Sequence, residues 1–167
     1  GLAAPDTDVT LADIARLADA FYIGGTKCGA LCGEAVVFPR GGMPRHFLTH
    51  AKQHGALLAK GRLLGVQFDT LFTNNLYGEV GRVAIAAADE LRRILREAGC
   101  TFFRESPTNQ QFVVLENAQV EALAERIRFS TWEKLGDGRT VIRLVTSWST
   151  TPDDLAALEA ALHEVMQ

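Results

Sequence analysis

Near the start of the chain, the spacing of apolar positions changes from the period of a helix to that of a strand. In residues 11–17 the apolar side chains recur every three or four positions, which predicts a short helix. Thr10 precedes this segment and Asp13 follows Thr10 by three residues, a pattern typical of a capping box. Residues 21–23 are aromatic or β-branched and predict a strand. We therefore expect a capped helix that leads into a strand.

The same two periods recur along the rest of the chain. Further helices are predicted over residues 45–53, 59–73, 76–98, 118–127 and 152–165. Further strands are predicted over residues 33–38, 100–104, 111–115, 129–135 and 140–147. Gly99 is placed to end the longest helix, and residues 136–138 to close a hairpin. Thr151 and Pro152 are typical of the start of the last helix. From residue 100 onward the pattern predicts a small α+β layer of sheet and helices.

Length and composition favour an ordinary globular protein. The chain has 167 residues, of which 47% are hydrophobic and 22% charged, as expected for one unit with a hydrophobic core. The formal charge of -3 gives no electrostatic reason to bind nucleic acid or an anionic membrane. No apolar run approaches the ~18 residues that span a bilayer, and the start lacks the pattern of a signal peptide. We expect a soluble, unexported protein that binds neither nucleic acid nor membrane.

The three cysteines indicate a reducing compartment. Cys28, Cys32 and Cys100 are an odd set, which argues against a disulfide framework and favours a cytoplasmic location. Cys28 and Cys32 could supply two of the ligands of a metal site, but Cys100 alone cannot supply the second pair that zinc usually needs. We expect buried thiols rather than metal ligands.

Lys27 follows an apolar segment and two glycines, so that a single amine stands at the end of a predicted strand. The glycines allow a tight turn and the close approach of a flat ligand. If the strand is buried, desolvation lowers the pKa of the lysine by up to ~3 to 5 units and frees the amine to condense with a carbonyl. The alternative is a solvated loop lysine, and the local sequence leaves both possibilities open.

Arg143 lies within a predicted strand, where alternation places it on the same face as Val141 and Val145. A guanidinium among apolar neighbours needs an anion, and its planar fork matches a carboxylate bidentately. An amino-acid substrate is therefore a natural partner. The alternatives are an arginine that snorkels from an edge strand and one that pairs with a structural acid.

His46, His50 and His54 follow one another at intervals of four residues and would share one face of a continuous helix, a spacing that can hold a metal. No glutamate follows His46 as a metalloprotease motif requires, and the predicted helix reaches only residue 53. We expect a solvent-facing row and no metal. Asn109 precedes a strand, where it contacts either a ligand or neighbouring backbone.

Seven segments follow one another along the chain at characteristic spacing, residues 11–20, 21–30, 33–38, 52–61, 65–68, 108–110 and 143–148. Together they resemble the threonine aldolase branch of the fold-type-I pyridoxal-phosphate enzymes. No single piece is diagnostic, but their order and spacing are fairly specific, and the resemblance covers nearly the whole chain.

The resemblance implies an α/β fold in which this chain is the C-terminal portion of the enzyme. Residues 1–75 would be the incomplete end of the large cofactor-binding domain, residues 76–99 a linking helix, and residues 100–167 a small α+β C-terminal domain. The chain starts without an initiator methionine, and we expect a cut end. The missing first half would supply the carboxylate for the pyridine nitrogen, the aromatic side chain stacked on the ring and much of the phosphate cup.

The resemblance also implies roles for individual residues. Lys27 would carry pyridoxal 5'-phosphate as a Schiff base, and Arg143 would bind the substrate α-carboxylate. Thr26 would reach the cofactor phosphate, unless its hydroxyl bonds its own backbone. Lys60, then Lys52 and least certainly Arg62 match basic side chains that approach the phosphate, sometimes across a subunit boundary. A solvated basic face is the alternative for these three cations.

The function that the resemblance implies is aldol cleavage of L-threonine or a related β-hydroxy-α-amino acid to glycine and an aldehyde. The alternatives are a β-eliminating amino-acid lyase with the same cofactor and a catalytically inert fragment. The expected partners are the N-terminal portion of the same enzyme as a separate chain, and further copies in a homodimer or homotetramer. The general base would be a histidine of the missing half, not one of the four histidines present.

Overall fold

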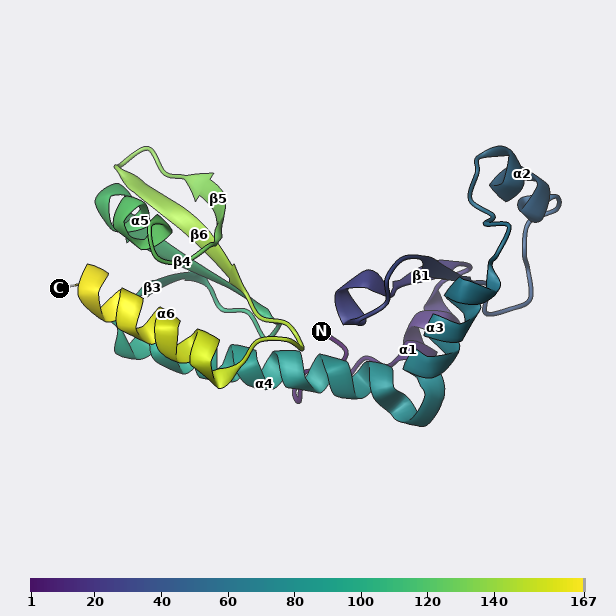
Figure 1. Ribbon diagram of the computed structural model, residues 1–167, viewed down its shortest axis with the longest axis horizontal. Helices are drawn as coiled ribbons and strands as arrows, with labels where there is room; N and C mark the ends of the chain where they lie inside the picture. The colour runs from purple at the N-terminus through teal and green to yellow at the C-terminus, as the bar shows by residue number, and fades with distance from the viewer. Residues whose placement is uncertain (167) are drawn as a thin grey trace. The chain divides into compact units, whose positions relative to one another are not determined.

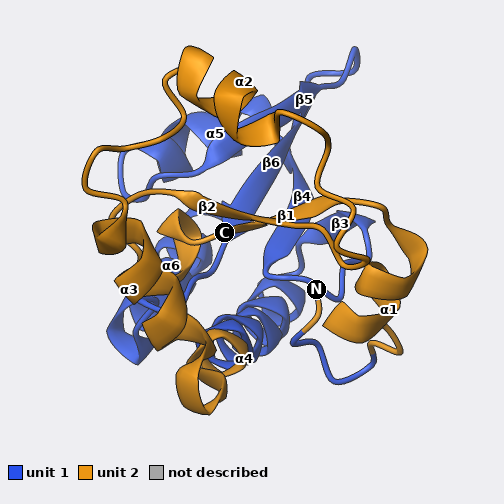
Figure 2. Ribbon diagram, turned by 90° about the vertical axis from the view of Figure 1, so that its right-hand side faces the viewer, with its two compact units in different colours: residues 1, 3–6, 80–167 blue, residues 2, 7–79 orange. Residues whose placement is uncertain are grey.

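The computed structural model describes residues 1–166, which form two compact units (Figure 2). Unit 1 contains Gly1, Ala3–Asp6 and the chain from Val80 onward, and unit 2 contains Leu2 and Thr7–Glu79. The division between them falls inside the long helix α4 (Leu76–Glu97), which was predicted as the linking helix. Each unit has its own antiparallel sheet.

Unit 1 is built on a four-stranded antiparallel sheet. In spatial order its strands are β3 (Thr101–Arg104), β4 (Gln110–Glu116), β6 (Arg139–Val145) and β5 (Ser130–Lys134). Its helices are most of α4, α5 (Asn117–Ala124) and α6 (Pro152–Val165). Figure 1 shows α4 and α6 running side by side along the sheet. The α+β layer expected from residue 100 onward is therefore present.

One face of this sheet packs against all three helices. Its inward residues contact leucine and isoleucine side chains of the helices in a single cluster that comprises Leu91, Ile94, Leu95, Cys100, Val113, Leu115, Leu123, Ile142, Leu144, Leu158, Ala161 and Leu162. Burial of each large apolar side chain contributes roughly 1.5–3 kcal/mol. Because alternate residues of a strand point to opposite faces, Phe112, Val141 and Arg143 lie on the other face.

The turn and cap signals of unit 1 are confirmed. Gly99 has a left-handed φ of 76° and lies two residues after Glu97, the last residue of α4. Thr151 caps α6 in a capping box with Asp154, and Pro152 occupies the first turn. In the hairpin between β5 and β6, Gly138 has a φ of 85°. These elements were predictable because each signal lies within a few residues of the feature it sets.

Unit 2 consists of short elements around a two-stranded sheet. In chain order they are α1 (Leu11–Leu17), β1 (Phe21–Gly24), the 3-10 turn η1 (Thr26–Cys28), β2 (Glu34–Val37), α2 (Phe47–Gln53), α3 (Arg62–Phe72) and the 3-10 turn η2 (Thr73–Asn75). The capping box of Thr10 and Asp13 at α1 is confirmed. Within residues 7–79, Leu71 is the one large apolar side chain that is buried. The unit thus has little core of its own.

Three predicted helix boundaries are wrong by two residues or more. Helix α2 begins at Phe47 rather than at residue 45, because His46 adopts a left-handed φ of 61°. Helix α3 begins at Arg62 rather than at residue 59. Helix α5 ends at Ala124 rather than at residue 127, since Ile127 packs against the core of unit 1 from beyond the helix. None of the helices within residues 1–166 combines the length and apolarity needed to cross a membrane.

Candidate functional site

Lys27 lies in the turn η1, three residues beyond the end of β1. The expectation of a buried strand and a desolvated amine is wrong for this structure, since Lys27 and Thr26 are exposed and β1 has no buried residue. Lys27 is exposed and β1 is not buried because a sheet of only two strands needs other elements to cover its faces. Within residues 1–166 the Lys27 amine has no hydrogen bond or ion pair.

The turn that presents Lys27 is well defined by its backbone. The amides of Cys28 and Ala30 both donate to the carbonyl of Gly25, at 2.9 and 3.0 Å. A Cβ atom at Gly25 would lie 2.9 Å from the Cβ of Ala30 and 3.0 Å from the ring of Phe68, so only glycine fits without displacement of its neighbours. Gly29 then takes a φ of 95°. The glycines at this turn therefore fix the position from which Lys27 projects.

Helix α3 runs along the segment that follows Lys27. The side chain of Gln67 accepts a hydrogen bond from the Leu31 amide at 2.6 Å, and Phe68 contacts Gly25. Lys60 lies two residues before the start of this helix, and Arg62 is its first residue. Phe68 lies six positions after Arg62 on this helix, which corresponds to roughly 9 Å along the axis. Both cations therefore stand near the far end of the helix that contacts the lysine turn.

Lys52 stands apart from this group. It lies in the last turn of α2, which Figure 1 shows set apart from β1 and α3. The side chains of Lys52, Lys60 and Arg62 are all exposed and have no ion pair within the described part of the chain. Thr26 thus lies beside Lys27 in η1, and Lys60 lies two residues before α3, but Lys52 lies on a separate element.

Arg143 lies on β6, an inner strand of the sheet, on the same face as Val141 and Val145 as expected. Its Nη1 donates to Oε1 of Gln110 at 3.2 Å and its Nη2 to Oγ of Ser130 at 3.4 Å. The guanidinium carbon lies 5.8 Å from the centre of the Trp132 ring. These partners are neutral, and the buried Nε has no partner at all within residues 1–166. Among the described residues, the charge of Arg143 therefore has no counter-ion.

Both alternatives for Arg143, snorkelling from an edge strand and pairing with a structural acid, are thereby excluded for the described residues. The arginine does not snorkel from an edge strand, because β5 and β4 flank β6 on both sides. It does not pair with a structural acid, because its hydrogen-bond partners within residues 1–166 are an amide and a hydroxyl. An uncompensated guanidinium that is held in place is suited to bind a carboxylate.

Sequence reasoning did not identify the residues that hold Arg143. Ser130 lies directly opposite Arg143 across β5 and β6, and Trp132 packs edge-on against Phe112 with ring centres 4.9 Å apart. Gln110 reaches the guanidinium from β4. The alternation of these strands was readable, but their register was not. Without register, the residue that faces Arg143 cannot be chosen.

Several smaller expectations are now decided. Asn109 donates from Nδ2 to the Thr146 carbonyl at 2.7 Å, so its side chain contacts neighbouring backbone. Thr26 makes no hydrogen bond to its own backbone in the part of the chain described. All three cysteines are free, but only Cys100 is buried, and burial raises the pKa of its thiol to about 11. Cys28 and Cys32 are half-buried, not fully buried as expected.

The histidine row does not form on one helix. His46 and His54 are the residues that flank α2 on either side, and only His50 lies inside it. Across residues 1–166, no three histidine, cysteine or acidic side chains are grouped so that they could hold a metal ion.

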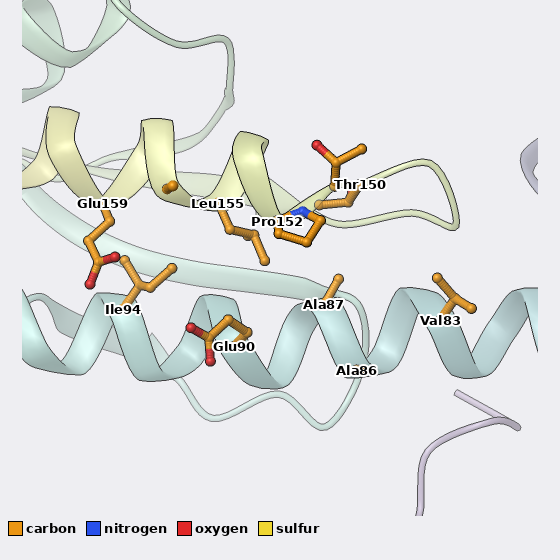
Figure 3. Close-up of a pocket in the computed structure, with 11 residues that line it drawn as sticks. Val83, Ala86, Ala87, Glu90, Ile94, Thr150, Pro152, Leu155 and Glu159 are labelled. Carbon is orange, nitrogen blue, oxygen red and sulfur yellow. The ribbon is translucent and has the colours of Figure 1, made fainter.

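A groove of about 470 Å³ runs along unit 1 between α4 and α6 (Figure 3). Val83, Ala87, Ile94 and Leu155 line it with apolar surface, and Glu90 and Glu159 supply its acidic groups. None of the predicted site residues lines it. Arg143, the one that belongs to unit 1, lies on the sheet face that does not pack against helices. Lys27 belongs to unit 2 and Arg143 to unit 1, so their meeting in one cavity stays a prediction.

Two comparisons with known proteins point to the same enzyme. The solved threonine aldolase of Leishmania major matches 99% of this chain with a TM-score of 0.93 and 38% identity, over 48% of its own length. A curated relative, the low specificity L-threonine aldolase of Pseudomonas aeruginosa, is 27% identical over 150 residues, which are 89% of this chain and 42% of that enzyme. This chain thus spans about half the length of the relatives it matches.

A more distant likeness concerns the fold alone. The serine palmitoyltransferase of Sphingomonas wittichii matches 88% of the chain at 13% identity with a TM-score of 0.61, over 39% of its own length. Mixed α/β architecture is therefore shared with part of a second kind of enzyme. No protein-family model matches the chain.

Proposed function

Because this chain belongs to the threonine aldolase family, we propose that it forms the C-terminal part of a pyridoxal-phosphate-dependent aldolase. The proposed reaction cleaves L-threonine or a related β-hydroxy-α-amino acid to glycine and an aldehyde. The observation that carries the proposal is the likeness to the Leishmania enzyme over 99% of this chain at 38% identity. The proposed assignment of residues 1–75 to a large domain and 100–167 to a small one follows from the same likeness.

The residues present fit the cofactor that this family uses. Lys27 offers an unpaired amine on a rigid turn, which is the group that condenses with an aldehyde. The free hydroxyl of Thr26 and the unpaired cations Lys60 and Lys52 are donors suited to a phosphate. When bound, pyridoxal phosphate supplies an electron sink for the bond that breaks at the substrate α-carbon. We assign Lys27, Thr26, Lys60 and Lys52 to this cofactor.

The role that we assign to Arg143 is to bind the substrate α-carboxylate. Its neutral neighbours hold the guanidinium without neutralising it, which leaves the full charge for an incoming anion. A carboxylate held at both oxygens cannot rotate, so the arginine orients the rest of the amino acid. The general base that accepts the β-hydroxyl proton is not assigned to any histidine of this chain.

We further propose that unit 2 is completed by other polypeptide. Leu17, Tyr22 and Leu31 are 70–82% exposed, and the β1–β2 sheet has both outer edges open. Apolar surface and open strand edges of this kind are normally covered. The proposed cover is the N-terminal portion of the same enzyme together with a symmetry-related copy in a homodimer or homotetramer. A cytoplasmic location likewise stays a prediction.

The proposal is tested by combining this chain with its upstream half and pyridoxal phosphate. Lys27→Ala is expected to abolish both the visible absorbance of bound cofactor and the release of glycine and aldehyde from threonine. Lys134→Ala removes an exposed lysine on β5 of unit 1 and serves as the control that keeps both. Reductive trapping of the cofactor followed by peptide mass analysis locates the attachment.

The two rival functions give different results in this experiment. If pyruvate and ammonia are the main products, the protein is a β-eliminating lyase rather than an aldolase. If no cofactor attaches and no product forms although the upstream half is present, the chain is an inert assembly module.

A further inference from the structure

Tyr77 connects the first turn of α4 to the end of β1, and both belong to unit 2. Its hydroxyl donates to the Gly24 carbonyl at 3.2 Å, across 53 positions of sequence. Gly24 immediately precedes Gly25, whose carbonyl accepts the two amide hydrogen bonds that shape the lysine turn. The hydroxyl of Tyr77 therefore bonds the backbone at the point where the strand becomes the turn that carries Lys27.

The ring of Tyr77 is itself held in place. It stacks on Phe72 with ring centres 5.1 Å apart and planes inclined by 14°. Burial, followed by the neighbouring Cys28 thiol, raises the pKa of Tyr77 above its usual range. The hydroxyl thus stays protonated and able to donate at neutral pH. Because Cys28 directly follows Lys27, the tyrosine meets the turn on both sides of the lysine.

Helix α3 supports the same turn through different contacts. Phe68 packs against Gly25, and Gln67 accepts the Leu31 amide. The Phe68 contact is apolar and the Leu31 hydrogen bond lies beyond the turn. Neither forms a hydrogen bond with the end of β1. The hydrogen bond from Tyr77 supplies that missing restraint, since it fixes the carbonyl of Gly24 directly.

We propose that Tyr77 is a positioning residue that holds the Gly24–Cys28 turn so that the amine of Lys27 is presented in one direction. The role rests on the proposed function, in which Lys27 bonds the cofactor. Tyr77 acts through the backbone of β1 and takes no part in the chemistry itself. Its effect is to keep the amine aligned with its partner during attachment.

The only other tyrosine of the chain provides a matched control. Tyr22 lies on β1, two residues before Gly24, and its side chain is 70% exposed. Its hydroxyl has no hydrogen bond within residues 1–166. Tyr22→Phe therefore removes a tyrosine hydroxyl on β1 without removing a hydrogen bond. Tyr77→Phe removes the hydrogen bond to Gly24 and keeps the stacked ring.

The first measurement is amide hydrogen exchange in the full-length protein that contains this chain. Tyr77→Phe is expected to raise exchange of the Cys28 and Ala30 amides roughly three- to tenfold, the effect of one lost hydrogen bond. Tyr22→Phe is expected to leave these amides unchanged, and neither variant should alter strands β4 and β6 of unit 1. Equal exchange in the two variants overturns the proposal. So does a rise of the same size throughout residues 7–79, because that result indicates a general structural role.

The second measurement is the pH profile of the visible absorbance of cofactor attached to Lys27. Its midpoint should move in Tyr77→Phe and stay in place in Tyr22→Phe, and a midpoint unchanged in both contradicts the proposal. If the unmodified protein attaches no cofactor at Lys27, the proposed function fails instead, and that failure is visible before any variant is compared.

A third variant covers the case in which Tyr77→Phe does not fold. Phe72→Leu keeps the hydroxyl of Tyr77 but removes its stacked partner. The proposal requires the Cys28 and Ala30 amides to remain protected in this variant. Loss of that protection would show that ring packing, rather than the hydrogen bond to Gly24, holds the turn.

Discussion

The two units of the chain differ in how much of their own surface they bury. In unit 1 a continuous apolar cluster joins three helices to one face of a four-stranded sheet. In residues 7–79 only Leu71 is buried among the large apolar side chains, and helices α1 and α2 bury none. Unit 1 therefore has the internal packing of an independent domain, whereas unit 2 resembles a domain from which a layer has been removed.

This difference also separates the two parts of the proposed site. Arg143 is arranged entirely by its own sheet, with partners from β4 and β5 that are present in unit 1. Lys27 stands on a well-formed turn but in exposed surroundings. Under the proposed function, the substrate-binding half of the site is thus preorganised within this chain, and the cofactor-binding half depends on covering polypeptide.

The largest expected effect is on the stability of unit 1. Leu95 is fully buried in its core, and Leu95→Ala should lower the free energy of unfolding by about 2–5 kcal/mol. The matched change in unit 2, Leu57→Ala, removes a side chain that is 48% exposed and should stay within about 0.5 kcal/mol. Urea unfolding followed by far-ultraviolet circular dichroism measures this, because helices of both units contribute to that signal.

The comparison of the units breaks if these two variants behave alike. A fall in stability for Leu57→Ala as large as that for Leu95→Ala would mean that unit 2 has a tightly packed core which the exposure of its side chains does not reveal.

A smaller effect is expected on catalysis. Under the proposed function, Arg143→Ala in this chain combined with its upstream half should lower kcat/KM for threonine roughly 10- to 100-fold, because hydrogen bonds between two charged groups are lost. Cofactor attachment to Lys27 should be unchanged. Arg143→Lys keeps the charge but loses the planar fork, so it should restore only part of the activity. The control, Arg128→Ala, removes an exposed arginine of unit 1. Loss of cofactor attachment in Arg143→Ala would contradict the division of roles between the units.

Local signals in the sequence predicted much of the fold. Helix α6 has the expected bounds because Thr151 and Pro152 mark its start chemically, and α4 ends at Glu97, two residues before Gly99. The strand alternation placed Arg143 on the correct face. In each case the information lies within one turn of helix or one strand, so it does not depend on the rest of the chain.

Contacts between distant segments were not predictable in this way. The bond from Tyr77 to Gly24 spans 53 residues, and the placement of Ser130 beside Arg143 requires the register of two strands. The exposure of Lys27 was missed for a related reason, because a strand looks buried in sequence whether or not the covering layer belongs to the same chain. Apolar composition reports the need for burial, not the segment that supplies it.

The smallest expected effect uses a local device that both units share. Thr10 caps α1 and Thr151 caps α6, each in a capping box with an aspartate three residues later. Helix α6 packs into the core of unit 1, so Thr151→Ala should lower the stability of unit 1 by about 1 kcal/mol. Helix α1 buries no residue, so Thr10→Ala should fray that helix without moving the fluorescence-detected unfolding of unit 1.

The effect of Thr151→Ala on stability should depend on pH through Asp154, the partner of Thr151 in the capping box. Hydrogen bonds from the backbone and side chain of Thr151 hold the pKa of Asp154 below its ordinary value of 3.8. A carboxyl group whose pKa is lower in the folded than in the unfolded state stabilises the fold above the ordinary value, and this contribution is lost as the pH falls through the lowered pKa. The stability difference between Thr151→Ala and the unmodified chain should therefore be full at neutral pH and shrink in acid. Urea unfolding at neutral and at acid pH measures the difference, and a difference that does not shrink in acid would show that the aspartate takes no part in the cap.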